Sequence, residues 1–160
     1  LKLPPVLCLH LQRRYGAHKI SDFVQFDLFI DLASIVLPAQ KHLKERVPDE
    51  AIPVPDDVPS KDESTTFTYA LCAVVEHKGG ARSGHYVTYR REAILRKAQK
   101  TEGLAEDDLR LETERNKDKV ARSKWYRVSD SSVVEVELKD VLQSQAYLLF
   151  YERLYLSADD

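Results

Sequence analysis

Residues 66–91 of the chain read TFTYALCAVVEHKGGARSGHYVTYRR. Apolar residues dominate as far as residue 77 and alternate between two faces of a strand, with Phe67, Tyr69, Leu71, Ala73 and Val75 on one and Ala70, Cys72 and Val74 on the other. This pattern is typical of a strand that is covered on both sides. Residues 78–84 contain three glycines and predict a turn or mobile loop, and residues 85–91 resume as a strand. We therefore predict a β-hairpin with an unusually flexible connection.

Before this hairpin, the pattern of apolar residues predicts further short elements. Residues 3–11 predict a core strand whose two prolines stand at its start, where a missing backbone N–H is tolerated. Residues 13–22 are polar and predict a loop or a wide hairpin. Residues 23–26 predict a short strand, and residues 27–36 fit either a strand or a helix.

After the hairpin, three more strands are predicted, at residues 124–128, 133–136 and 146–153. Residues 138–144 predict a short helix, because the acidic Glu137 and Asp140 stand near its start. Together these elements predict an α+β fold with a mostly antiparallel sheet.

Two polar segments interrupt the predicted sheet. Residues 45–64 contain four prolines and seven acidic residues, so they predict a surface loop or a disordered insertion. Residues 92–123 are about half charged and their leucines are too scattered for a buried stripe, which predicts a solvated, partly helical excursion.

The overall composition excludes several classes of protein. The chain has 160 residues, of which 43% are hydrophobic and 31% charged, enough for one domain with a sizeable core. No segment approaches the roughly 20 apolar residues of a membrane helix, so we expect no membrane contact from this chain. The net charge of −2 offers no excess for binding nucleic acid. The chain contains no methionine, and we expect it to be a processed or excised piece of a longer protein.

The two cysteines, Cys8 and Cys72, are far apart in the sequence and lie in apolar runs. A free cysteine in such a run behaves as a small buried hydrophobic residue, and a reducing, intracellular compartment fits this use best. A disulfide or a catalytic role is the alternative. Cys8 and His10 could share one face of a strand, but two ligands do not make a metal site. We therefore predict no metal and no cofactor.

Two segments carry residues that a purely structural sheet does not require. In Gly84-His85-Tyr86 the histidine follows a glycine-rich loop, where a substrate backbone could approach closely. In residues 128–132, which read VSDSS, a hydroxyl or a carboxylate could accept the Nδ1–H of a histidine on a neighbouring strand and fix its tautomer for general-base work. The alternatives are a hairpin turn with an exposed histidine and an Asp/Ser turn that bonds its own backbone. Neither cysteine has a cation or helix N-terminus nearby to favour a thiolate, so these residues supply half an active site.

Five blocks of sequence, in order, resemble the C-terminal half of the catalytic domain of the ubiquitin-specific proteases. They are LPPVLCLHLQR (3–13), YALCAVVEHKG (69–79), GHYVTY (84–89), WYRVSD (125–130) and AYLLFYER (146–153). The resemblance implies a papain-like cysteine protease fold, with the palm and part of the fingers in residues 1–160. It also implies that the thumb, which carries the catalytic cysteine, is absent. Apolar faces of the strands in this chain are then expected to be covered by that N-terminal half.

The resemblance further implies hydrolysis of the isopeptide bond at the C-terminus of ubiquitin. His85 corresponds to the catalytic histidine, Ser129 to the third catalytic residue, and Asp130 to an acidic residue that supports the site. Ubiquitin binding is implied for Gly79, Gly80, Gly84 and Tyr86, which correspond to the mobile loop and the channel for the ubiquitin tail. The implied partners are ubiquitin, ubiquitinated proteins and the N-terminal half of the same catalytic domain.

Two positions depart from the common pattern of the family. Most members have Asn or Asp where this chain has Ser129, and a hydroxyl stabilises an imidazolium less than a carboxylate does. With the LHLQR block (9–13), this serine looks most like the mitochondrial outer-membrane member, which faces the cytosol and uses a Cys-His-Ser triad. Arg14 replaces a common phenylalanine, which puts in doubt an apolar contact to the ubiquitin tail.

Two other functions stay open from the sequence. The first is a ubiquitin-binding module with the same fold but no catalytic cysteine in its partner thumb. The second is an unrelated β-rich adaptor that uses residues 66–91 as a docking surface.

Overall fold

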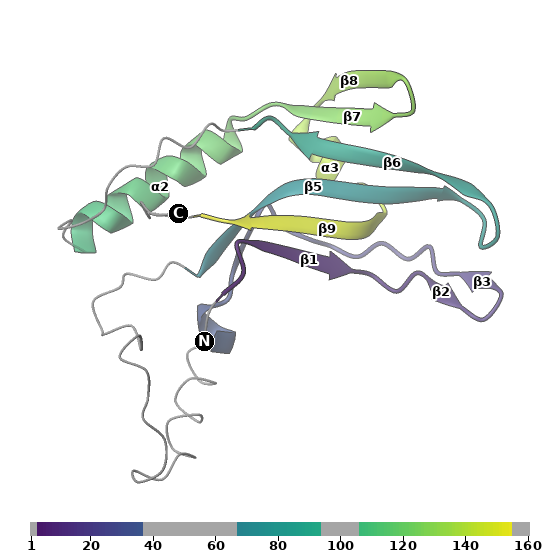
Figure 1. The fold of residues 1–160 in the computed structure, drawn as a ribbon, viewed down its shortest axis with the longest axis horizontal. Coiled ribbons are helices and arrows are strands. Elements are labelled where there is room, and N and C mark those ends of the chain that lie inside the picture. The colour runs from purple at the N-terminus through teal and green to yellow at the C-terminus, as the bar shows by residue number, and fades with distance from the viewer. Residues whose placement is uncertain (1–2, 37–66, 94–105, 155–160) are drawn as a thin grey trace, which may run out of the picture.

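The computed structural model describes residues 3–36, 67–93 and 106–154. Its main sheet has the strand order β1-β9-β5-β6-β7-β8, with β4 also paired to β5 (Figure 1). Every pairing in this sheet is antiparallel, which confirms the predicted α+β fold with a mostly antiparallel sheet. The elements are β1 (Val6–His10), β2 (Arg14–Tyr15), β3 (His18–Lys19), β4 (Phe29–Asp31), β5 (Thr68–Gly79), β6 (Gly84–Arg91), α2 (Glu106–Ala121), β7 (Trp125–Ser129), β8 (Ser132–Val136), α3 (Leu138–Leu142) and β9 (Ala146–Arg153).

The predicted central hairpin is present as β5 and β6, which pair from Ala73 with Arg90 to Gly79 with Gly84. The strict alternation predicted for β5 is wrong, because the pairing of β5 with β9 shifts register between Leu71 and Ala73. Such a β-bulge moves the following side chains to the opposite face. Leu71 and Val74 are therefore both fully buried, whereas Ala73 is only half-buried.

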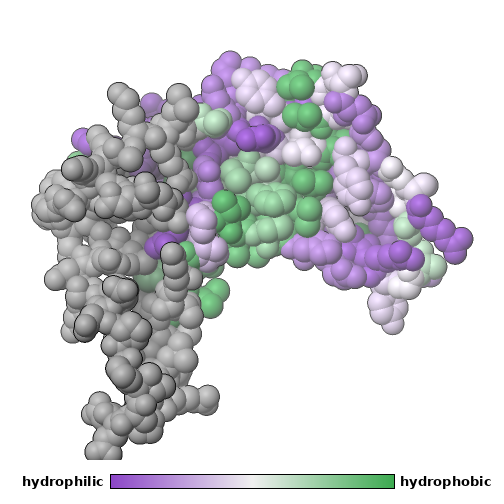
Figure 2. All heavy atoms as spheres, in the orientation of Figure 1, coloured by the Kyte–Doolittle hydropathy of each residue, from purple (hydrophilic) through white to green (hydrophobic). Residues whose placement is uncertain are grey.

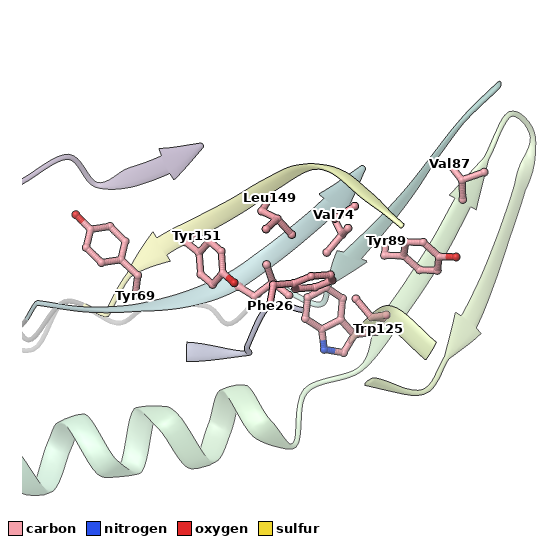
Figure 3. Close-up of a cluster of buried hydrophobic side chains, with 11 residues drawn as sticks. Phe26, Tyr69, Val74, Val87, Tyr89, Trp125, Leu149 and Tyr151 are labelled. Atoms are coloured by element: carbon pink, nitrogen blue, oxygen red, sulfur yellow. The ribbon is translucent and has the colours of Figure 1, made fainter. Parts of the chain in front are cut away.

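The main core lies where β5, β6, β7 and β9 pack with α3 (Figure 3). Trp125, at the start of β7, is the largest fully buried side chain, and Tyr151 and Val141 are buried beside it in the same cluster. The indole, phenol and aliphatic groups of this cluster fix the relative positions of β6 and β7. This matters for function because two of the three predicted catalytic residues, His85 and Ser129, stand at the ends of these two strands.

The strand predicted in residues 3–11 is present as β1, but the prediction that it lies in the core is wrong. β1 is the terminal strand of the sheet order and pairs with β9. Of its five residues, Leu7 is half-buried and the other four are exposed. Cys8 is therefore exposed rather than buried. Figure 2 shows apolar side chains gathered on the visible face over the middle of the sheet, where β1, β9 and β5 run.

The elements predicted between residues 13 and 36 are right in part. The hairpin expected in residues 13–22 is present as the pair β2 and β3, but it is tight rather than wide, because Tyr15 pairs with His18. Residues 23–26 form no strand, although Phe26 is buried in the main core. The short strand comes later, as β4, and residues 33–36 are helical, so both readings of residues 27–36 apply to different parts.

The polar insertion predicted at residues 92–123 contains the helix α2, which confirms its partly helical character. Val120, near the end of α2, packs with Ala70 and Leu154 in a second small core. The short helix is confirmed as α3, with Glu137 at its N-cap position. Residues 45–64 and 94–105, which belong to the two predicted insertions, lie outside the described residues. Within the described residues, no helix is long and apolar enough to cross a membrane.

Candidate active site

His85 is the second residue of β6 and lies between the exposed first residue of that strand and its buried middle part. The residues two and four positions further along, Val87 and Tyr89, are buried in the core. Because side chains alternate along a strand, His85 shares their face. Its side chain is 41% exposed, so the imidazole is held by the strand and remains open to a reacting group.

Ser129, the last residue of β7, contacts this imidazole directly. Its Oγ lies 2.7 Å from Nε2 of His85. The prediction that this segment would bind Nδ1 is therefore wrong for the serine. When Nε2 carries the ring proton it donates that proton to Ser129 Oγ, and Nδ1 then keeps the lone pair that a general base needs.

Asp130 lies on the other side of the ring. Its Oδ2 is 3.7 Å from Nδ1 of His85, and its side chain is 83% exposed. At this distance a carboxylate attracts a protonated imidazole, but exposure to water keeps the attraction weak. The structure thus brings all three predicted catalytic residues together, with Ser129 and Asp130 on different nitrogens.

A tight turn between β7 and β8 places these two residues side by side. Ser129 pairs with Ser132, so only Asp130 and Ser131 lie between the two strands. Asp130 has a φ of 47°, in the left-handed region that aspartate tolerates better than most residues. The turn expected from the sequence is present, and the side chains of Ser129 and Asp130 face His85.

The glycine-rich connection before His85 is sterically demanding at two of its three glycines. Gly79 has a φ of 121°, and a Cβ there would lie 2.7 Å from both the Cα of Gly84 and the carbonyl oxygen of Ser83. A Cβ at Gly84 would overlap the imidazole of His77 and the carbonyl oxygen of Lys78. A Cβ at Gly80 would have no atom within 4 Å. The turn is therefore closed tightly at its two ends and open at Gly80.

Glu76 is a buried carboxylate that joins three segments beneath the site. It accepts a hydrogen bond from Tyr89 Oη at 3.2 Å and one from the backbone N–H of Gln145 at 3.4 Å. Burial and this carboxylate together raise the pKa of the Tyr89 phenol, so the phenol remains a donor at neutral pH. Glu76 thus ties β5 to β6 and to the residue that precedes β9.

A row of rings crosses four strands next to His85. The ring centroids of His77 and Tyr86 lie 4.9 Å apart, those of Tyr86 and Tyr147 5.8 Å, and those of Tyr147 and His10 4.8 Å. Tyr86 is 55% exposed, so its ring is available to a partner. Sequence reasoning singled out Tyr86 but missed His77 and Tyr147, because their contacts join strands that are remote in the sequence.

Neither cysteine lies with His85. Cys72 is six residues from Lys78, the residue that pairs with His85, which is about 20 Å along a strand. Its thiol donates to the carbonyl oxygen of Phe150 at 3.3 Å, and burial raises its pKa, as does the Glu152 carboxylate. Such a thiol is a poor nucleophile. The described residues also contain no group of three or more His, Cys, Asp or Glu side chains that could hold a metal ion.

Arg14, the other departure from the expected pattern, is exposed on β2 and donates from Nε to the carbonyl oxygen of Gly16 at 2.9 Å. The preceding residue, Arg13, is buried and donates from Nε to the carbonyl oxygen of Ala146 at 2.9 Å. Arg13 therefore fixes the chain after β1 against the start of β9.

Comparison with known proteins gives consistent matches. The family model described as ubiquitin carboxyl-terminal hydrolase matches residues 1–151. Ubiquitin carboxyl-terminal hydrolase 16 of Mus musculus is 34% identical over 155 residues, which are 94% of this chain and 16% of that protein. Ubiquitin carboxyl-terminal hydrolase 22 of Homo sapiens is 30% identical over 159 residues, 97% of this chain and 23% of that protein. The chain thus spans less than a quarter of the length of either relative.

Solved structures of similar fold agree with the architecture. The SAGA Ubp8/Sgf11/Sus1/Sgf73 DUB module contains a chain that matches with a TM-score of 0.54 at 24% identity, over 94% of this chain and 24% of that one. The same module bound to ubiquitin aldehyde matches with a TM-score of 0.54 at 22% identity, over 94% of this chain and 24% of that one. These likenesses confirm the predicted fold class.

Proposed function

The chain belongs to the ubiquitin carboxyl-terminal hydrolase family, and from this premise we propose that it forms the histidine-bearing part of a deubiquitinating cysteine protease. The observation that carries the proposal is the contact of 2.7 Å between His85 Nε2 and Ser129 Oγ at the ends of two neighbouring strands. Family membership excludes the unrelated adaptor. The whole domain would span residues 1–160 and an N-terminal half with the catalytic cysteine.

In the proposed reaction, Nδ1 of His85 takes the proton of a cysteine thiol supplied by the N-terminal half. The thiolate attacks the carbonyl carbon of the last glycine of ubiquitin, and the protonated His85 then gives its proton to the departing lysine amine. His85 next takes a proton from water, which hydrolyses the thioester and releases ubiquitin and the thiol. Ser129 orients the ring through Nε2, and Asp130 supports the site through water near the oxyanion.

The proposed partners are ubiquitin, ubiquitinated proteins and the N-terminal half of the domain. Ubiquitin would reach His85 past Gly79, Gly80, Gly84 and Tyr86, all four of which are exposed. The N-terminal half would cover apolar side chains that are exposed on β1, such as Val6 and Leu9. The apolar side chains that Figure 2 shows gathered over the middle of the sheet support the proposal, since large exposed apolar patches mark interaction sites.

The test of this function is reaction with a ubiquitin that carries an electrophile at its C-terminus. We expect the assembled catalytic domain, containing both halves, to form a covalent adduct, and the present chain alone to form none and to cleave no ubiquitin conjugate. Binding without an adduct would favour the alternative, a ubiquitin-binding module with the same fold. Cleavage by the present chain alone would overturn the assignment of the nucleophile to the other half.

Replacing Ser129 by alanine tests the orienting role. The loss of a hydrogen bond to a ring that becomes charged costs about 1.5–3 kcal/mol, so kcat should fall about 10- to 150-fold while the melting temperature changes little. Ser132→Ala is the matched control, because Ser132 pairs with Ser129 across the turn and is exposed. Steady-state hydrolysis of a ubiquitin C-terminal amide measures both. An unchanged kcat in Ser129→Ala would contradict the assignment.

We further propose that the intact protein is most similar to the mitochondrial outer-membrane member of the family and faces the cytosol. Ser129, in place of the more common Asn or Asp, supports this. The intact, tagged protein should fractionate with mitochondria and be digested by protease added outside them, and a purely soluble distribution would contradict the proposal.

A further inference from the structure

Lys19, at the end of β3, reaches across to the strand that leads into the glycine turn. Its Nζ donates to the carbonyl oxygen of His77 at 2.6 Å and to that of Gly79 at 2.8 Å. These residues are 58 and 60 positions away in the sequence. The lysine therefore joins the hairpin of β2 and β3 to the end of β5.

The two carbonyls need a donor because β9 no longer covers this edge of β5. The pairing of β5 with β9 ends at Glu76 and Ala146, whereas β5 continues to Gly79. Alternate residues of a strand direct their carbonyls to the same edge, so the oxygens of His77 and Gly79 point together beyond the last β9 pair. An ammonium group has three donors and can satisfy both oxygens at once.

The two carbonyls also flank the residue that faces His85 in the hairpin. Lys78 pairs with His85, His77 with Tyr86, and Gly79 with Gly84. The imidazole of His77 lies directly over Gly84, so that even a methyl group at Gly84 would displace it. If the backbone of His77 and Gly79 moved, the paired residues Gly84 and His85 on β6 would therefore move with it.

We propose that Lys19 is a positioning residue for His85. It holds the end of β5 in strand geometry, and thereby holds His85 where Ser129 Oγ reaches Nε2. This inference rests on the proposed function, in which His85 is the general base. Lys19 does not contact the reacting atoms in this proposal, so its loss should lower kcat more than it raises KM.

The test compares Lys19→Met with Lys19→Arg in the assembled catalytic domain. Methionine matches the apolar stem of lysine as far as Cε but donates no hydrogen bond, and arginine keeps a charged donor. Lys124→Met is the matched control, since Lys124 forms an exposed ion pair with Glu135 at 3.0 Å. We expect Lys19→Met to lower kcat roughly tenfold with KM changed less than about twofold, Lys19→Arg to recover most of kcat, and Lys124→Met to match the wild type.

Hydrogen–deuterium exchange supplies a readout that does not depend on catalysis. In Lys19→Met the amides of residues 77–86 should exchange roughly tenfold faster, while those of the core strand β9 stay unchanged. Unchanged exchange and unchanged kcat would overturn the proposal, as would a rise in KM at constant kcat, which would make Lys19 a substrate-binding residue. If the wild type forms no adduct with the ubiquitin electrophile, the proposed function fails, and faster exchange still supports the link between Lys19 and the turn.

Discussion

His85→Ala in the assembled catalytic domain is expected to lower kcat for cleavage of a ubiquitin C-terminal amide by about 10³- to 10⁴-fold. The variant removes the group that takes the thiol proton and later protonates the leaving amine, and general acid–base groups contribute about this much. The side chain is 41% exposed at the end of β6 and is not in the main core, so its truncation should leave the melting temperature nearly unchanged.

His18→Ala is the control for this substitution, because His18 is exposed on β3. It should retain the wild-type kcat, and both variants should bind ubiquitin as the wild type does. The rate of adduct formation with the ubiquitin electrophile should fall in His85→Ala alongside kcat, since both need the thiolate. Retention of more than a tenth of the wild-type kcat would show that another group acts as the base.

The sequence predicts the members of the candidate site better than their geometry. Ser129 and Asp130 are predictable because a polar turn between two β segments is a local pattern, and His85 because it directly follows the glycine turn. Which ring nitrogen each residue faces depends on how β6 and β7 twist past each other. This is why the sequence predicts only that a hydroxyl or a carboxylate of the turn faces Nδ1, whereas in the structure the Ser129 hydroxyl contacts Nε2 and the Asp130 carboxylate is the group near Nδ1.

The errors in the fold have the same origin in contacts between remote segments. The register shift after Leu71 arises from pairing with β9, which lies about 80 residues further along the chain. β1 has the apolar sequence of a core strand, but its place at the sheet edge is set by the order of the strands. Lys19 carries no local signal at all, because a single lysine in a polar hairpin is ordinarily a solvated residue.

Gly84→Ala is the second substitution expected to have a large effect. Its Cβ would overlap the Lys78 carbonyl oxygen and the His77 ring, and the carbonyl cannot move without shifting the backbone of β5. Relief by moving Gly84 would displace the next residue, His85, from Ser129. Since a misplacement of about 1 Å can cost about 10²-fold in rate, we expect kcat/KM to fall by about that factor, mostly through kcat.

Gly80→Ala separates crowding from the general loss of a glycine. It makes the same chemical change in the same turn, but its Cβ would have no atom within 4 Å, and Gly80 is not among the glycines with positive φ. Its kcat should therefore stay within about twofold of the wild type. If Gly80 contacts the ubiquitin tail, as proposed, the substitution would raise KM and leave kcat unchanged. Equal losses of kcat in the two variants would mean that the turn needs flexibility at every glycine, and that the fit of Gly84 beneath His77 is not what holds His85 in place.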